Sequence, residues 1–175
     1  MSHDRNRIDR RIPGLQVLLE TLGVSIVDGA VTVPFGPGSD AGPTELAAIG
    51  WATVELDRAE ADLGAELATT FEPASRDALL GATVRRSTTG GPEIVLLEPD
   101  TEGRLAGALA RHGEGPIALY LRVPGLDEIP AQLETRPGTG PFGPARLVLN
   151  GPPAGPFLIL VDPAPAHADR VPSGT

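Results

Sequence analysis

Short runs of alternating apolar and polar residues recur along the chain, and this is the pattern of β-strands with one buried face. The runs that predict strands are Ile49–Leu56, Thr69–Ser75, Leu79–Ser87, Pro92–Pro99, Pro116–Val123, Ala145–Gly151 and Pro156–Asp162. Apolar residues at helical spacing between them predict helices over Asp57–Ala68, Thr101–Gly115 and Leu126–Glu134. We expect Asp57 and Thr101 to cap two of these helices, and Gly113 to end the second.

The order of these elements repeats. One β-α-β-β-β unit is followed by a connecting helix and then by β-α-β-β, so the second copy looks one strand short. This order predicts an α+β fold in which paired βαβββ modules form one mixed sheet.

A different pattern precedes the modules. Four leucines have helical spacing and are followed by Gly23, a typical helix stop; they are Leu15, Leu18, Leu19 and Leu22. Two β-prone runs within Val24–Phe35 flank an Asp-Gly pair at 28–29, a strong hairpin signal. We expect this extension to be ordered, with its leucines packed on the domain, where they could cover an edge left by the short second module.

These patterns divide the chain into five segments. We expect a disordered tail over 1–12, the helix–hairpin extension and a linker over 13–48, the first module over 49–100, the connecting helix and the second, shortened module over 101–163, and a disordered tail over 164–175.

Composition excludes several classes of function. With 175 residues the chain is long enough for one domain with a core, and a net charge of −9 argues against nucleic acid and anionic membrane surfaces as partners. No apolar run approaches the roughly 18 residues that span a bilayer, and no signal peptide is evident, so the cytoplasm is the expected location. Cysteine is absent, and all 14 basic residues are arginine, which excludes thiolate ligands and Schiff-base lysines. This bias also suggests a GC-rich genome such as that of an actinomycete.

Three stretches resemble the methylmalonyl-CoA epimerase branch of the vicinal oxygen chelate superfamily, which also includes glyoxalase I and the bleomycin resistance proteins. They are LLGATV (79–84), EIVLLEPDTEGRLAGALARHGEG (93–115) and RPGTGPFGPARLVLNGPPAGPFLILVD (136–162). The resemblance extends over 49–162 and implies a cup-shaped sheet. In that superfamily the cup holds one divalent cation, bound by side chains from the first and fourth strands of each module.

The aligned ligand positions are apolar here. The resemblance places them at Trp51, Val95, Ala118 and Ile159. None of these side chains can bind a divalent cation, which needs His nitrogen or carboxylate oxygen. No histidine lies in any predicted strand. We therefore expect neither a metal nor another cofactor.

Strand alternation indicates which side chains share the face of the lost ligands. Every second residue along each strand from the four aligned positions should lie on that face. These residues are Thr53, Glu55, Glu93, Leu97, Tyr120, Arg122, Phe157 and Val161. An apolar floor with a polar rim is the usual form of a small-molecule site. The predicted ligand-binding residues are Trp51, Thr53, Val95, Leu97, Ala118, Phe157 and Ile159.

Three polar residues are candidates for proton chemistry: Tyr120, Glu55 and Arg122. Alternatively, Arg122 and Glu55 form an ion pair between the modules, or Arg122 holds a ligand carboxylate or phosphate. One of Arg85 and Arg86 faces the cup, and the sequence leaves open which one.

Three functional hypotheses remain open. The first is a metal-free protein that binds a small hydrophobic or aromatic natural product, as in self-resistance by sequestration. The second is a metal-independent isomerase, epimerase, cyclase or lyase that acts on an acyl or polyketide substrate in secondary metabolism. The third is an interaction module whose cup is filled by its own side chains. The expected partner is a small organic molecule, and a homodimer is left open.

Overall fold

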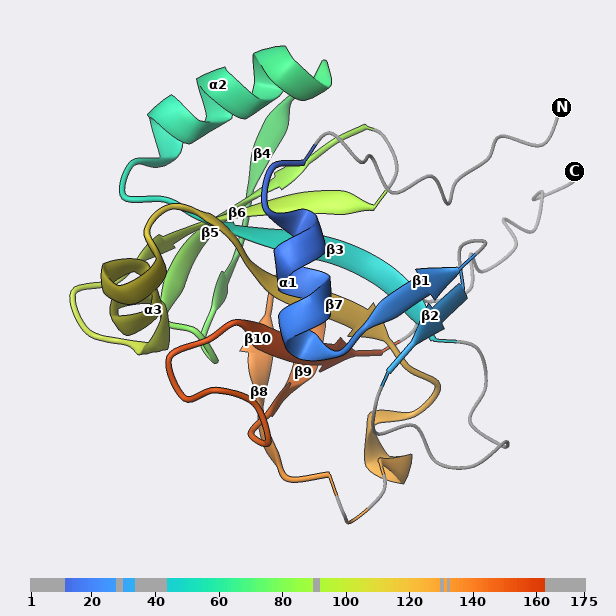
Figure 1. Ribbon diagram of the computed structural model, residues 1–175. Coiled ribbons are helices and arrows are strands. Elements are labelled where there is room, and N and C mark those ends of the chain that lie inside the picture. The colour runs from blue at the N-terminus through green and yellow to red at the C-terminus, as the bar shows by residue number, and fades with distance from the viewer. Residues whose placement is uncertain are drawn as a thin grey trace, which may run out of the picture.

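The computed structural model describes residues 12–27, 30–33, 44–89, 92–129, 131 and 133–162. The elements are α1 (Leu15–Leu22), β1 (Ser25–Val27), β2 (Ala30–Thr32), β3 (Glu45–Ala52), α2 (Leu56–Leu67), β4 (Phe71–Asp77), β5 (Ala82–Ser87), β6 (Glu93–Pro99), α3 (Arg104–His112), β7 (Gly115–Arg122), the 3-10 turn η1 (Leu126–Glu128), β8 (Thr135–Gly140), β9 (Gly143–Val148) and β10 (Phe157–Val161). Figure 1 shows a curled sheet with the helices around it. No helix among these residues is long and apolar enough to cross a membrane.

The curled sheet has eight strands in the order β4-β5-β6-β3-β7-β10-β9-β8. It consists of two equivalent halves, β4-β5-β6-β3 and β8-β9-β10-β7, in which the inner pair is parallel and the outer pairs are antiparallel. The antiparallel pair of β3 and β7 joins the halves. This topology confirms the predicted α+β fold of paired modules.

The second module is not a strand short, so that expectation was wrong. Its outermost strand is β8, which pairs with β9 over its whole length. The segment reads TRPGTG, and its proline and two glycines hid the strand. A strand at the end of a sheet tolerates proline, because one side of it needs no ladder partner.

Among the described residues of the second module, no α-helix lies between β7 and β8. The predicted helix over 126–134 is reduced to η1. The leucines of α1 fill the gap: they are buried in one cluster with Leu119 and Leu121 of β7 and with Leu158 and Leu160 of β10. In the first module α2 covers the same face through Leu56, Ala59 and Leu63. The extension therefore packs on the domain as predicted, but on the face of a central strand and not on a sheet edge (Figure 1).

The helix ends agree with the predictions at one terminus only. Gly23 and Gly113 follow α1 and α3 with positive φ, where glycine carries no steric penalty. The predicted caps Asp57 and Thr101 are wrong. Helix α2 begins at Leu56, whose N–H donates to Oε2 of Glu98 at 2.9 Å, and α3 begins at Arg104 after Gly103.

The tails and two connecting segments lie largely outside the described residues. Ile12, assigned to the disordered tail, is buried at 6% exposure in the core. The Asp-Gly pair at 28–29 is not described, although β1 and β2 pair on either side of it. The linker is described only from Thr44, and β3 begins at Glu45, inside the segment expected to precede the first module.

The two end strands of the sheet approach each other and narrow the cup. The N–H of Ala78, just after β4, donates to the carbonyl of Thr139 in β8 at 2.9 Å. At the same seam a Cβ on Gly138 would lie 2.6 Å from Cδ2 of Leu79, so only glycine fits there without a shift. The sheet thus encloses an interior, which is distinct from the outer face covered by α1 and α2.

Candidate functional site

The interior of the cup is filled by apolar side chains. Val95, Leu97, Ala118 and Ile159 are 0% exposed, and Phe157 is 3% exposed. They belong to one buried cluster, which is separate from the cluster on the outer face. Five predicted ligand-binding residues therefore share the interior, as strand alternation indicated.

Trp51 does not share that interior, and its predicted place was wrong. Its side chain packs on the outer face with the cluster that contains the α1 leucines. The residue of β3 paired with both Val95 and Ala118 is Gly50. A Cβ on Gly50 would meet the Cβ of Ala118 at 2.9 Å, so position 50 faces inward and position 51 faces outward.

These positions do not fit a metal ion. From β3 the interior receives Ala48, Gly50 and Ala52, and from the other strands Val95, Ala118 and Ile159. None of them carries a nitrogen or oxygen ligand on its side chain. Within the described residues no three His, Cys, Asp or Glu side chains lie close enough together to hold a cation.

Tyr120 is the large polar side chain of the interior. It is 0% exposed, and its hydroxyl donates to Oδ2 of Asp77 at 2.7 Å. Oδ1 of Asp77 accepts the N–H groups of Leu79 at 3.0 Å and Leu80 at 2.9 Å. Burial raises the pKa of Asp77 and, together with the charge of Asp77, the pKa of Tyr120. The pair joins the central strand β7 to the end strand β4 across the interior.

Glu55 and Thr53 lie away from Tyr120. Glu55 precedes α2 and is exposed, and its carboxylate is 3.7 Å from Nε of Arg58. Because β3 and β7 are antiparallel, residues that follow β3 lie at the end of β7 opposite to Arg122. The proposed Glu55–Arg122 ion pair is therefore not formed. The buried hydroxyl of Thr53 donates to Oε1 of Glu114 at 2.7 Å.

Glu114 was not predicted as important, yet it holds this end of the cup together. It accepts hydrogen bonds from Thr53, from the N–H of Val54 at 2.8 Å, and from Nη2 of Arg58 at 2.7 and 2.8 Å. These bonds, led by that of Arg58, lower the pKa of Glu114 to about 2. Its position between two glycines in GEG was the only sequence signal.

The structure settles which neighbouring arginine faces the cup. Arg85 pairs with Asp57 and Glu60 on α2, so it lies on the outer face. Arg86 donates from Nε and Nη2 to the two oxygens of Glu93 at 2.7 and 2.8 Å, and from Nη1 to the carbonyl of Pro141 at 3.2 Å.

Arg86 and Glu93 belong to the mouth of the cup, together with Arg122 and Phe142. Phe142 lies on the turn that connects β8 and β9. Its ring packs on the Tyr120 ring, with centroids 5.5 Å apart. The guanidinium carbons of Arg86 and Arg122 lie 4.2 and 5.5 Å from the centre of the Phe142 ring. One aromatic ring, flanked by two cations, thus covers the buried tyrosine.

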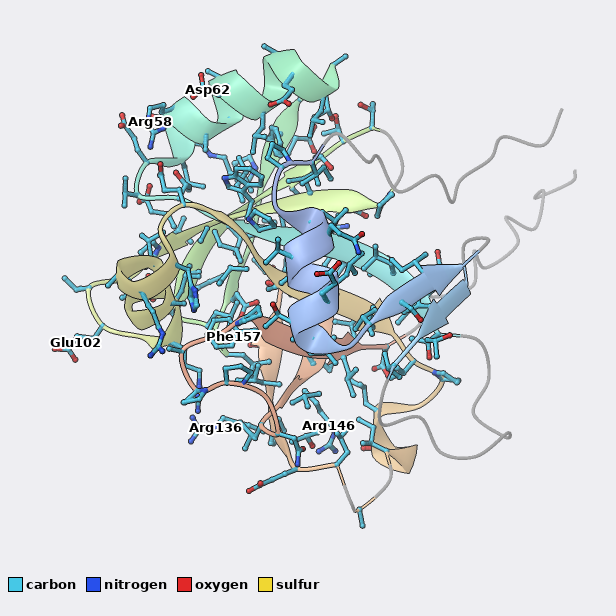
Figure 2. The ribbon with its side chains drawn as sticks, in the orientation of Figure 1. Arg58, Asp62, Glu102, Arg136, Arg146 and Phe157 are labelled. Atoms are coloured by element: carbon cyan, nitrogen blue, oxygen red, sulfur yellow. The ribbon has the colours of Figure 1, made fainter. Side chains whose placement is uncertain are left out.

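Arg122 is half-buried at this mouth. Its cross-strand neighbour is Glu45, but the described residues supply no carboxylate within ion-pair distance of its guanidinium. By contrast, Arg146 on β9 has Asp127 at 3.5 Å; it and Arg136 of β8 are labelled on the second module in Figure 2. Phe157, labelled in the same view, belongs to the filled interior.

Solved structures of low sequence identity share this architecture. A hypothetical protein from Bacillus halodurans superposes with a TM-score of 0.59 at 17% identity, covering 70% of this chain and 96% of that one. Methylmalonyl-CoA epimerase from Mycobacterium tuberculosis gives 0.59 at 21% identity, covering 69% and 88%. A Streptomyces coelicolor methylmalonyl-CoA epimerase variant gives 0.57 at 18% identity, covering 69% and 94%. The chain has the vicinal oxygen chelate fold.

The similarity to these structures extends over the paired modules. At such low sequence identity it shows the fold alone. No protein-family model and no curated protein matches the sequence.

Proposed function

We propose that this chain is a metal-free protein of the vicinal oxygen chelate fold that binds a small organic anion with a flat, apolar part. The binding site is the mouth of the cup, formed by Arg86, Glu93, Arg122 and Phe142. The observation that carries the proposal is the half-buried Arg122 guanidinium, which has no carboxylate partner among the described residues.

The chemistry of the mouth selects an aromatic carboxylate. Arg86 is already neutralised by Glu93, so Arg122 supplies the net positive charge. A guanidinium binds a carboxylate through two parallel N–H bonds, which suits a planar anion. The guanidinium planes of Arg86 and Arg122, which lie against the Phe142 ring, provide stacking surfaces for an aromatic group.

Because the interior is filled, we assign the ligand to the mouth and not to the cup floor. Val95, Leu97, Ala118, Phe157 and Ile159 pack against one another, so in this proposal they support the site from below. The Streptomyces coelicolor epimerase structure contains 2-nitronate-propionyl-CoA, an organic anion in the same fold.

The enzyme hypothesis receives no comparable support. A metal-independent isomerase, epimerase, cyclase or lyase needs an acid or base that meets its substrate. Tyr120 is fully buried and bonded to Asp77, and Glu55 lies at the other end of the cup.

Calorimetric titration with naphthoate and related aromatic carboxylates tests the binding proposal. We expect saturable binding with one ligand per chain. Arg122→Gln should weaken it about tenfold or more, because hydrogen bonds to charged groups contribute roughly 1.5–3 kcal/mol. The matched control is Arg136→Gln, an exposed arginine on β8. Equal affinities of the two variants would overturn the assignment of the site to the mouth.

A further inference from the structure

Phe142 occupies the place in which the proposed ligand would stack. Its ring contacts the buried Tyr120 ring on one side and lies within 4.2 and 5.5 Å of the Arg86 and Arg122 guanidinium carbons. A ring in contact with two cations and another aromatic side chain is in an arrangement that is favourable for any flat aromatic group. The chain itself supplies that group here.

The turn that carries Phe142 has one buried residue, Pro141, and one half-buried residue, Phe142 itself. It is the two-residue connection Pro141–Phe142 between β8 and β9, at the end of the sheet. Its polar contact to the rest of the mouth, within the described residues, is the 3.2 Å bond from Arg86 to the Pro141 carbonyl. Gly143 follows with φ of +96° and open space around its Cα. Phe142 is only half-buried, unlike the interior residues beneath it.

Arg122 is the cation that the proposed ligand would meet beside the Phe142 ring. If Phe142 were only a structural plug, it would need no cation beside it that lacks a carboxylate partner among the described residues, since an apolar contact would serve equally well. An arginine held over an aromatic ring without a carboxylate partner can instead bind an incoming anion while its plane keeps the stacking contact. Arg122 would then bind the carboxylate of a ligand and stack on its aromatic ring at the same place.

We propose that Phe142 is a built-in occupant of an aromatic slot, and that the planar ring of an aromatic carboxylate displaces it when the carboxylate binds Arg122. This inference rests on the proposed function and adds its specificity determinant. The slot accepts a ring of about the width of phenyl or naphthyl, and the turn moves outward as the ligand enters. Phe142 thereby competes with the ligand and lowers its apparent affinity.

The test is a comparison of naphthoate affinity between the wild-type chain and Phe142→Ala. Removing the competing ring should tighten binding by about two- to tenfold, the range expected for one aromatic contact. Phe142→Trp retains a competing ring and should bind no more tightly than wild type. Val54→Ala, on the exposed loop after β3 at the opposite end of the cup, is the control and should leave the affinity unchanged.

A second readout follows the ring itself. The chain has four phenylalanines, so selective labelling gives few ring signals in NMR spectra, and Phe142→Trp assigns one of them. We expect naphthoate to shift the Phe142 signal toward that of a solvated ring, because it loses the Tyr120 face. Cooperative melting of each variant confirms that the mouth is compared in folded chains.

The outcomes separate the two proposals. If Phe142→Ala binds naphthoate more weakly than wild type, Phe142 is part of the site wall, and the displacement proposal is wrong while binding at the mouth stands. If wild type binds and the Phe142 signal does not move, the displacement proposal is also wrong. If neither wild type nor Phe142→Ala binds any aromatic carboxylate, both proposals fail.

Discussion

At the scale of single residues, two clusters of polar side chains lie at opposite ends of the cup. At one end Glu114 collects four hydrogen bonds and joins the loop before α2 to the start of β7. Its partner Arg58 lies on the first turns of α2 (Figure 2). At the other end Arg122 lies over Phe142. The Glu114 cluster holds two segments of the fold together, whereas Arg122 has no carboxylate partner among the described residues.

Glu114→Gln should lower stability in a pH-dependent manner. The folded-state pKa of Glu114, about 2, lies below the ordinary glutamate value of 4.5. Its contribution is therefore fully present above pH about 4.5 and is lost as the pH falls toward about 2. We expect a loss of about 1 kcal/mol near neutral pH, since the side chain is partly exposed to solvent. The loss should shrink in acid.

Denaturant unfolding at a series of pH values measures this effect. The control is Glu102→Gln, an exposed carboxylate on the loop before α3 (Figure 2). A Glu114→Gln loss that stays constant down to pH about 2 would show that the carboxylate charge contributes nothing.

At the scale of elements, α1 covers the outer face of the second module, where a helix of that module was expected. The pseudo-symmetric sheet offers two equivalent outer faces, and α2 covers one of them. The second module carries Pro130 where its helix was expected and forms only the 3-10 turn Leu126–Glu128. An uncovered face of β7 and β10 would expose leucines to water, so burying the α1 leucines on it removes apolar surface from both sides.

Leu18→Ala should destabilise the whole domain if α1 is part of its core. Leu18 is 3% exposed, and truncating a fully buried leucine costs roughly 2–5 kcal/mol. Val17→Ala, one residue earlier and 65% exposed, should change stability by less than about 0.5 kcal/mol. Both are measured by denaturant unfolding. Similar midpoints for the two variants would mean that α1 detaches without cost.

At the scale of the whole molecule, the interior of the cup is a packed core. The strands that would line a metal site present Ala48, Gly50, Val95, Ala118 and Ile159. These side chains fill the space between the sheet halves, and Tyr120 with Asp77 braces it. Packing inside the cup therefore contributes to the stability of this chain, together with packing on the outer face.

We expect neither a chelator nor millimolar divalent cation to change the melting temperature by more than about 1 °C, because no binding free energy is added to the folded state. Elemental analysis of untagged, dialysed protein is the parallel measurement. His3 and His167 lie in the tails, outside the described residues, and a variant with both changed to alanine is the control for adventitious binding. One equivalent of zinc, manganese, cobalt, nickel or iron retained by that variant would contradict the expectation.

Much of the fold was predictable from local pattern. The alternating runs located seven of the eight strands of the curled sheet, and leucine spacing located α1. The eighth strand escaped because proline and glycine argue against a strand unless its edge position is known. At the site, strand alternation placed Val95, Leu97, Ala118, Phe157 and Ile159 on one face, and it missed Asp77 because the partner of that residue is 43 positions away in the chain.

The sequence by itself determined the paired modules, the extension and the apolar character of the ligand positions, since these depend on local periodicity and residue type. Only the tertiary structure decided that Gly50 and not Trp51 faces the interior. In β3 it is Gly50 that pairs with both Val95 and Ala118, and an alignment that is wrong by one residue moves a side chain to the opposite face of a sheet. The tertiary structure likewise decided that Arg86 and not Arg85 reaches the mouth. Alternation along a strand puts the two side chains on opposite faces, but which face turns inward depends on how the sheet curls around its core.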